Sequence, residues 1–161
     1  MANEQQSVLG IDPGYGRMGY AVVVGRGDDA TLATVGCIET HAAQEHPARL
    51  NEIANGVRRL IEEYRPDTLA IEKLFFSKNQ TTALAVAESR GVVLAVAGAF
   101  GMRVIELGPR QVKQALTGHG AAKKDQVHDM TLRFLKRSEP IKPDDAADAA
   151  AIALTGLYKR K

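Results

Sequence analysis

The 161-residue chain is poor in cysteine, nearly balanced in charge and without a long uncharged apolar run. Its one cysteine, Cys37, excludes an intramolecular disulfide and a zinc site built from cysteines, and it suits a reducing cytosol. The most apolar stretch, roughly residues 83–100, carries Glu88 and Arg90 near its middle, which argues against a membrane span. Residues 1–6 are polar and lack the apolar core of a signal peptide. We therefore expect a cytoplasmic protein with no membrane partner.

The net charge is only +2, so the overall charge does not indicate a nucleic-acid partner. The distribution of charge is more informative, because basic residues crowd the chain from residue 103 onward and end in a short basic tail at about 159–161. A phosphate-binding surface could lie in this half. A solvated face with a charged tail explains the same pattern.

A glycine-rich turn lies within residues 8–24, V-L-G-I-D-P-G-Y-G-R-M-G-Y-A-V-V-V. Gly14, Gly16 and Gly19 match G-x-G-x-x-G, which in dinucleotide-binding proteins opens a helix that faces the pyrophosphate. Here the β-branched residues 20–24 predict a second strand instead. The glycines therefore belong to a strand–turn–strand, where we expect them to supply backbone conformations that other residues avoid.

The remaining pattern predicts an α/β protein with one mixed sheet. Strands are expected over 8–12, 18–25, 31–40, 67–73 and 103–107, with a turn at 27–29 and a polar loop at 77–80. Helices are expected over 47–64, 81–100, 123–137 and 143–158, with a shorter one from residue 109. A three-strand antiparallel meander followed by strands separated by helices places helices on both faces of the sheet, within a single domain over residues 1–161.

The helix expected over 81–100 is apolar nearly all round, so both of its sides should be covered. One side is expected to pack on the sheet. The other side packs either on a second subunit or on neighbouring elements of the same chain.

Carboxylates end two of the expected strands and open the last helix. Asp12 closes the first strand, Glu72 lies at the end of the fourth, and Asp145 and Asp148 share one face of the helix over 143–158. The first strand and the strand after the first crossover are usually neighbours, so we expect Asp12 and Glu72 side by side under that helix face. The small residues 149–151 let the helix approach the sheet closely. Spacing alone leaves Asp144 as an alternative, because it is an i,i+4 neighbour of Asp148.

Four converging carboxylates would repel one another and raise their own pKa values, unless divalent cations lie between them. Mg²⁺ fits oxygen ligands of this kind, and Mn²⁺ could replace it. Two such ions roughly 4 Å apart can activate a water and stabilise the leaving oxygen in phosphodiester cleavage. Simpler interpretations stay open, because Asp12 before Pro-Gly suits a turn and Asp145 suits the first turn of a helix.

Five segments in order resemble the RuvC-type Holliday junction resolvases over essentially the whole chain. They are L-G-I-D-P-G at 9–14, A-I-E-K-L-F at 70–75, R-Q-V-K-Q at 110–114, K-D-Q-V at 124–127 and D-A-A-D-A at 145–149. Each segment alone is a weak signal, but the five together at this spacing are specific. The resemblance implies a ribonuclease H-like fold and a homodimer that cuts four-way DNA junctions symmetrically in recombination and repair. It also implies cooperation with branch-migration proteins of the RuvA and RuvB type.

The resemblance further implies roles for individual residues. Asp12, Glu72, Asp145 and Asp148 correspond to the metal-binding catalytic acids, and Lys124 to a lysine that stabilises charge near the scissile phosphate. An aromatic residue at the place of Phe75 is implicated in stacking on junction bases, although core packing is the alternative. The full set of DNA-binding candidates is Phe75, Lys78, Arg110, Lys113, Lys123 and Lys124.

Three other functions share part of this pattern. A ribonuclease H-like nuclease of ribosomal RNA precursors has a similar start, but it is usually shorter and lacks the segments around Lys113 and Lys124. An ATPase of the sugar-kinase and heat-shock type shares the aspartate and the glycine turn, but it needs a second, similarly folded domain. A non-enzymatic junction-binding module would not need four converging acids.

Overall fold

The computed structural model describes residues 5–26, 28–75 and 80–159, and its centre is one five-stranded sheet in the order β3-β2-β1-β4-β5. The first three strands, β1 (Gln6–Asp12), β2 (Arg17–Arg26) and β3 (Asp29–Glu39), form an antiparallel meander. The other two, β4 (Thr68–Glu72) and β5 (Arg103–Leu107), continue the sheet parallel to β1. The predicted mixed sheet is confirmed, and so is the pairing of β1 with β4.

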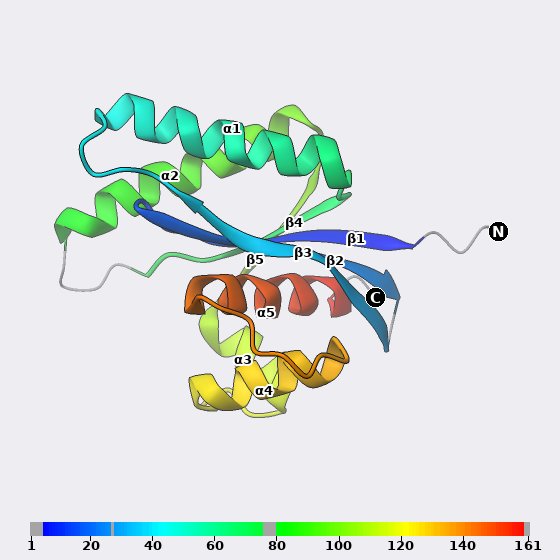
Figure 1. Ribbon diagram of the computed structural model, residues 1–161. Coiled ribbons are helices and arrows are strands. Elements are labelled where there is room, and N and C mark those ends of the chain that lie inside the picture. Colours follow the sequence, from blue (N-terminus) through cyan, green and yellow to red (C-terminus); the bar gives the residue numbers. More distant parts are fainter. Residues whose placement is uncertain (1–4, 27, 76–79, 160–161) are drawn as a thin grey trace.

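Helices cover both faces of this sheet (Figure 1). One face carries α1 (His46–Tyr64) and α2 (Gln80–Ala99), and the other carries α5 (Asp144–Tyr158), with α3 (Pro109–Thr117) and α4 (Lys124–Phe134) outside it. Side chains alternate along β1 accordingly. Val8 belongs to the core under α5, whereas Leu9 and Ile11 belong to the core under α1 and α2.

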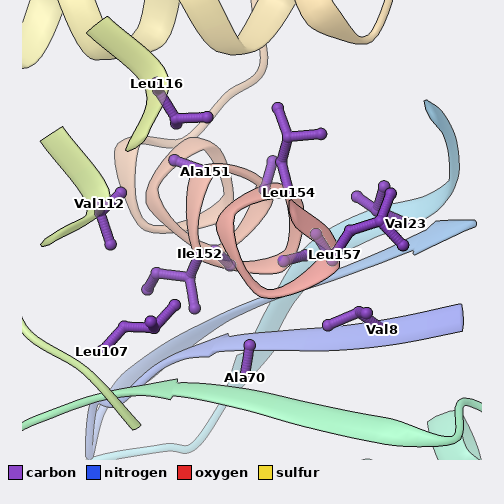
Figure 2. Packing of buried hydrophobic residues seen from close by; sticks show 14 of the residues in the cluster. Val8, Val23, Ala70, Leu107, Val112, Leu116, Ala151, Ile152, Leu154 and Leu157 are labelled. Carbon is purple, nitrogen blue, oxygen red and sulfur yellow. The ribbon is translucent and has the colours of Figure 1, made fainter. Parts of the chain in front are cut away.

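The last helix packs directly on the sheet (Figure 2). It comes this close because glycines of the sheet face the backbone of the helix. A Cβ atom on Gly10 would lie 2.4 Å from the carbonyl oxygen of Ala149, and one on Gly19 would lie 1.9 Å from that of Asp145. Real Cβ atoms do not approach this closely. The glycines of β1 and β2 therefore set how deeply the first turn of α5 sits, and with it the position of Asp145.

The expected role of Gly14, Gly16 and Gly19 is wrong. The described glycines with positive φ lie elsewhere in the chain, so these three do not supply a conformation that other residues avoid. Gly14 and Gly19 supply space instead, since a Cβ atom on Gly14 would lie 1.8 Å from the carbonyl oxygen of Arg17. Gly16 has room for a side chain, because the nearest atom would be 3.6 Å away.

Helix α4 is shorter than its sequence pattern predicts, ending at Phe134 rather than at residue 137. The chain turns there because Lys136 takes up a left-handed conformation with φ of 53°. The backbone N–H of Arg137 then returns to the carbonyl of Leu132 at 2.9 Å, which closes the helix. Of the predicted turn and loop, residue 27 and residues 77–79 lie outside the described part of the chain.

Helix α2 is the most apolar element. By length and composition alone, its stretch Thr81–Ala99 could cross a membrane, a test that the core helix of a folded domain also passes. Only 22% of this stretch is buried, and Leu84 is 64% exposed. The other elements of the described chain therefore leave one apolar face of α2 open.

Candidate active site

Asp12 and Glu72 lie side by side where β1 and β4 end. The parallel register pairs Ile11 with Ile71, so the next residue of each strand is a carboxylate at the same edge of the sheet. Burial, followed by the nearby charges of Glu72, Asp148 and Asp145, raises the pKa of Asp12 to about 8. Burial and the charge of Asp148 also raise the pKa of Glu72, while its hydrogen bond with Asp12 acts in the opposite direction. These carboxylates therefore form one electrostatic cluster.

Asp148 enters this cluster from α5 and is held by two side chains of α4. Nζ of Lys124 lies 3.0 Å from Oδ2 of Asp148, and Nε2 of His128 lies 2.8 Å from Oδ1. Burial alone would raise the pKa of Asp148, but the hydrogen bonds from His128 and Lys124 outweigh it and lower that pKa. Burial likewise works to lower the pKa of Lys124, but its contacts with Asp148 and Asp144 raise it. The pair is therefore ionised at neutral pH, as an ammonium and a carboxylate.

Asp145 and Asp144 are adjacent at the start of α5 but contact different side chains. Oδ2 of Asp145 lies 3.7 Å from Nη1 of Arg17 on β2, and the charge of Asp145 acts on Asp12. Asp144 points outward with 79% of its side chain exposed, and its Oδ2 lies 3.4 Å from Nζ of Lys124. The geometry thus favours Asp145 as the acid that faces the cluster, as the family resemblance implies.

A cavity of about 230 Å³ opens beside the acids. Both predicted lysines, Lys113 from α3 and Lys124 from α4, line it together with Glu72 and Asp148. The rest of its lining is apolar and comprises Pro109, Val112, Val127, Ala151 and Ile152. An anion that entered this cavity would meet two ammonium groups directly beside the carboxylates.

The other described DNA-binding candidates do not line this cavity. Phe75 follows β4 and is 69% exposed, which excludes the alternative of core packing. Lys123 precedes α4 with an exposed side chain. Arg110 lines a separate groove with His119 and Lys159. Lys78 lies outside the described residues.

His128 and Arg17 contact two of the acids, Asp148 and Asp145, and neither was predicted from the sequence. His128 had a usable signal, because it follows Lys124 by four residues and so lies on the same face of α4. Arg17 had none, because its contact depends on how α5 crosses β2.

The turn after Asp12 is also held by side chains that the sequence does not single out. The hydroxyl of Tyr15 lies 2.6 Å from Nδ1 of His46, whose Nε2 in turn contacts Glu88 on α2. The guanidinium of Arg49 lies 3.7 Å from the centre of the Tyr15 ring. These contacts tie the turn that follows Asp12 to α1 and α2 on the face of the sheet opposite α5.

The acids offer the oxygen ligands that hard divalent cations prefer. Their side chains are, however, not arranged around one point as a complete set of metal ligands. Within the described residues, no three His, Cys, Asp or Glu side chains are grouped to hold a metal ion. Both oxygens of Asp148 are occupied by α4, and Asp145 reaches toward Arg17. The donors near Asp12 are nevertheless all carboxylate oxygens, which Mg²⁺ and Mn²⁺ prefer. A divalent cation would relieve the repulsion that raises the pKa of Asp12.

Comparison with known proteins identifies the family of the chain. The family model of "Crossover junction endodeoxyribonuclease RuvC" matches residues 8–156. The RuvC protein of Synechococcus sp. (strain WH7803) is 44% identical over 95% of this chain and 99% of its own length, and that of Brevibacillus brevis is 46% identical over 92% and 89%. The structure of T. thermophilus RuvC in complex with Holliday junction substrate matches with a TM-score of 0.91 and 37% identity, covering 96% of this chain and 95% of that one. The expected ribonuclease H-like fold is thereby confirmed.

Proposed function

Because the chain belongs to the RuvC family of crossover junction endodeoxyribonucleases, we propose that its acidic cluster cuts four-way DNA junctions. The activity is that of a Holliday junction resolvase, a nuclease of homologous recombination and DNA repair. The match over residues 8–156 supports a single nuclease domain for the chain.

One observation carries the assignment of the site. The pKa of Asp12 is raised to about 8, because burial and three neighbouring carboxylates act on it at the edge of the sheet. Such a concentration of buried negative charge costs stability, so it is typical of a functional site. The catalytic residues of the proposal are Asp12, Glu72, Asp145 and Asp148, with Lys124.

Nucleases of this family depend on divalent cations. We assign the four acids as the ligands and Mg²⁺ as the ion, in two sites, with Mn²⁺ as a substitute. When bound, the ions would activate a water and stabilise the leaving oxygen. The all-carboxylate donor set supports this choice, since softer metals favour imidazole or thiolate ligands.

The chain's own residues prepare the reaction. β1 and β4 hold Asp12 and Glu72 on rigid strand ends, which fixes their carboxylates in place. Lys124 and Lys113 line the adjacent cavity, where their ammonium groups would stabilise the charge that develops on the phosphate. Water would attack phosphorus in line and the bond to the 3′ oxygen would break, leaving a 5′-phosphate and a 3′-hydroxyl.

Residues around the acids would hold the junction. The exposed ring of Phe75 would stack on an unpaired base, and Lys123 and Arg110 would contact flanking phosphates. We keep Lys78 as a candidate on the strength of its sequence alone.

Symmetric cleavage requires two active sites, and the open apolar face of α2 supports a homodimer. The exposed Leu84 belongs to this face, whose apolar area would be buried between two copies. A two-fold axis would relate the two sites as it relates the two cut strands. We further propose that the protein works with branch-migration proteins of the RuvA and RuvB type and that it is cytoplasmic.

The family match separates this function from its rivals. A nuclease of ribosomal RNA precursors would lack the segments of Lys113 and Lys124, which here line the cavity beside the acids. An ATPase with two similar domains does not fit relatives that the chain covers almost completely. A mere binding module would not bury carboxylates together.

The direct test mixes the protein with an end-labelled four-way junction and, separately, with a linear duplex of the same arm sequence. Each is incubated with Mg²⁺, with Mn²⁺ and with EDTA. Paired symmetric nicks in the junction alone, and only with metal, are expected. Tight junction binding without cutting in either metal would contradict the proposal and favour a binding module.

A further inference from the structure

Both carboxylate oxygens of Asp148 are occupied by residues one helical turn apart on α4. Oδ1 accepts a hydrogen bond from Nε2 of His128 at 2.8 Å, and Oδ2 contacts Nζ of Lys124 at 3.0 Å. An ionised carboxylate can only accept hydrogen bonds, so Nε2 of His128 must carry the hydrogen. Two residues on one face of α4 therefore each contact a different oxygen of Asp148.

Lys124 and His128 lie on different sides of Asp148. Lys124 lines the cavity of about 230 Å³ that also contains Glu72 and Lys113, and its side chain is 50% exposed. His128 lines another cavity, of about 130 Å³, together with Pro140 and Ile141, and its side chain is only 21% exposed. Lys124 is therefore on the side that a phosphate would enter, and His128 is on the side that is packed against the rest of the protein.

We propose that His128 is a positioning residue that holds Oδ1 of Asp148 throughout the reaction, while Lys124 releases Oδ2 and moves to the phosphate. The inference rests on the proposed metal-dependent function, because Oδ2 then becomes a ligand oxygen. It gives the two residues different tasks, although both contact the same carboxylate.

The division follows from what each side chain can do. An imidazole packed by its neighbours donates one hydrogen bond in a fixed direction, which orients a ligating carboxylate. Lysine carries its charge on a flexible stem with three donors, so it can exchange one oxygen partner for another. The additional contact of Lys124 with Asp144, at 3.4 Å, shows that its ammonium already serves more than one carboxylate.

The test compares two substitutions at the same position. His128→Gln keeps an N–H donor at a similar reach, whereas His128→Phe keeps a packed ring and removes the donor. Asp129→Asn serves as the matched control, because Asp129 is the exposed neighbour of His128 on α4. Thermal unfolding followed by circular dichroism establishes that each variant is folded before it is compared.

The primary readout is Mn²⁺ uptake by the DNA-free protein, followed as the loss of the free-ion signal in electron paramagnetic resonance. His128→Phe should weaken uptake by about 10-fold or more, the usual effect of losing a partner of a ligand residue. His128→Gln and Asp129→Asn should stay within about threefold of the wild-type protein. Junction affinity in EDTA should be the same for all four proteins.

Lys124→Met completes the comparison. If Lys124 is the exchangeable partner, this variant should take up Mn²⁺ at least as well as the wild-type protein and yet cleave the junction far more slowly. A folded His128→Phe variant with wild-type Mn²⁺ uptake would overturn the proposal, as would equal losses in His128→Gln and His128→Phe. Failure of the wild-type protein itself to take up Mn²⁺ or to cut the junction would instead overturn the underlying function.

Discussion

Asp12 and Glu72 end two parallel neighbouring strands one residue beyond the Ile11–Ile71 pair, so their carboxylates meet at one edge of the sheet. The raised pKa of both groups expresses the cost of this placement. Residues 8–11 of β1 and 68–71 of β4 are buried, which leaves the carboxylates that follow them little freedom to move apart.

The first prediction concerns the pH dependence of stability without metal. The pKa of Asp12 is about 8 in the folded protein and about 3.8 ordinarily, so the folded state binds this proton more tightly than the unfolded state does. Protonation of Asp12 therefore adds to the free energy of unfolding. This stabilisation is complete below about pH 4 and is lost as the pH rises through 8. In EDTA, the melting temperature of Asp12→Asn should therefore exceed that of the wild-type protein by more at pH 9 than at pH 5. An equal difference in melting temperature at pH 5 and pH 9 would contradict the raised pKa of Asp12.

The second prediction concerns the contact between β2 and α5. A Cβ atom on Gly19 would lie 1.9 Å from the carbonyl oxygen of Asp145, a backbone atom that cannot move without its helix. Gly19→Ala should cost about 1–3 kcal/mol in the free energy of unfolding, measured with urea, because overpacking forces the backbone to shift. Gly98→Ala on α2 is the control, since a Cβ atom there meets nothing within 4 Å. It should be neutral or stabilise by up to about 1 kcal/mol.

Part of this structure follows from the sequence and part does not. Apolar, β-branched runs and strand-end acids are local signals, so the sheet and the meeting of Asp12 with Glu72 could be predicted. Whether α4 ends at Phe134 depends on the left-handed turn at Lys136, which the helical pattern does not reveal.

The candidate site could likewise be predicted only in part from the sequence. The acids could be proposed from their positions and from the family resemblance. The spacing of His128 from Lys124 places both on one face of α4, but the hydrogen bond of His128 with Asp148 also depends on how α4 packs across α5. The same holds for Gly19, whose need for space arises from a helix more than a hundred residues later in the chain.

A third prediction tests the open face of α2. Leu84 is 64% exposed on this helix, so Leu84→Asp should place a charge in the proposed dimer interface. Sedimentation velocity should show a shift from dimer to monomer. Phe75→Ser is the matched control, because Phe75 is similarly exposed, at 69%, but follows β4 three residues after Glu72. It should remain a dimer and lose junction affinity, and a dimeric Leu84→Asp variant would rule out this face.

The most direct test of the acidic cluster is single-turnover cleavage of a four-way junction in Mg²⁺ by Asp12→Asn, with Asp144→Asn as the control. Asp12→Asn should lose cleavage by about 1,000-fold or more and still bind the junction, because binding depends on the basic residues rather than on this carboxylate. Asp144→Asn should stay within about fivefold of the wild-type rate, since its contact with Lys124 is exposed to solvent. An Asp12→Asn protein that cuts at the wild-type rate would contradict the account.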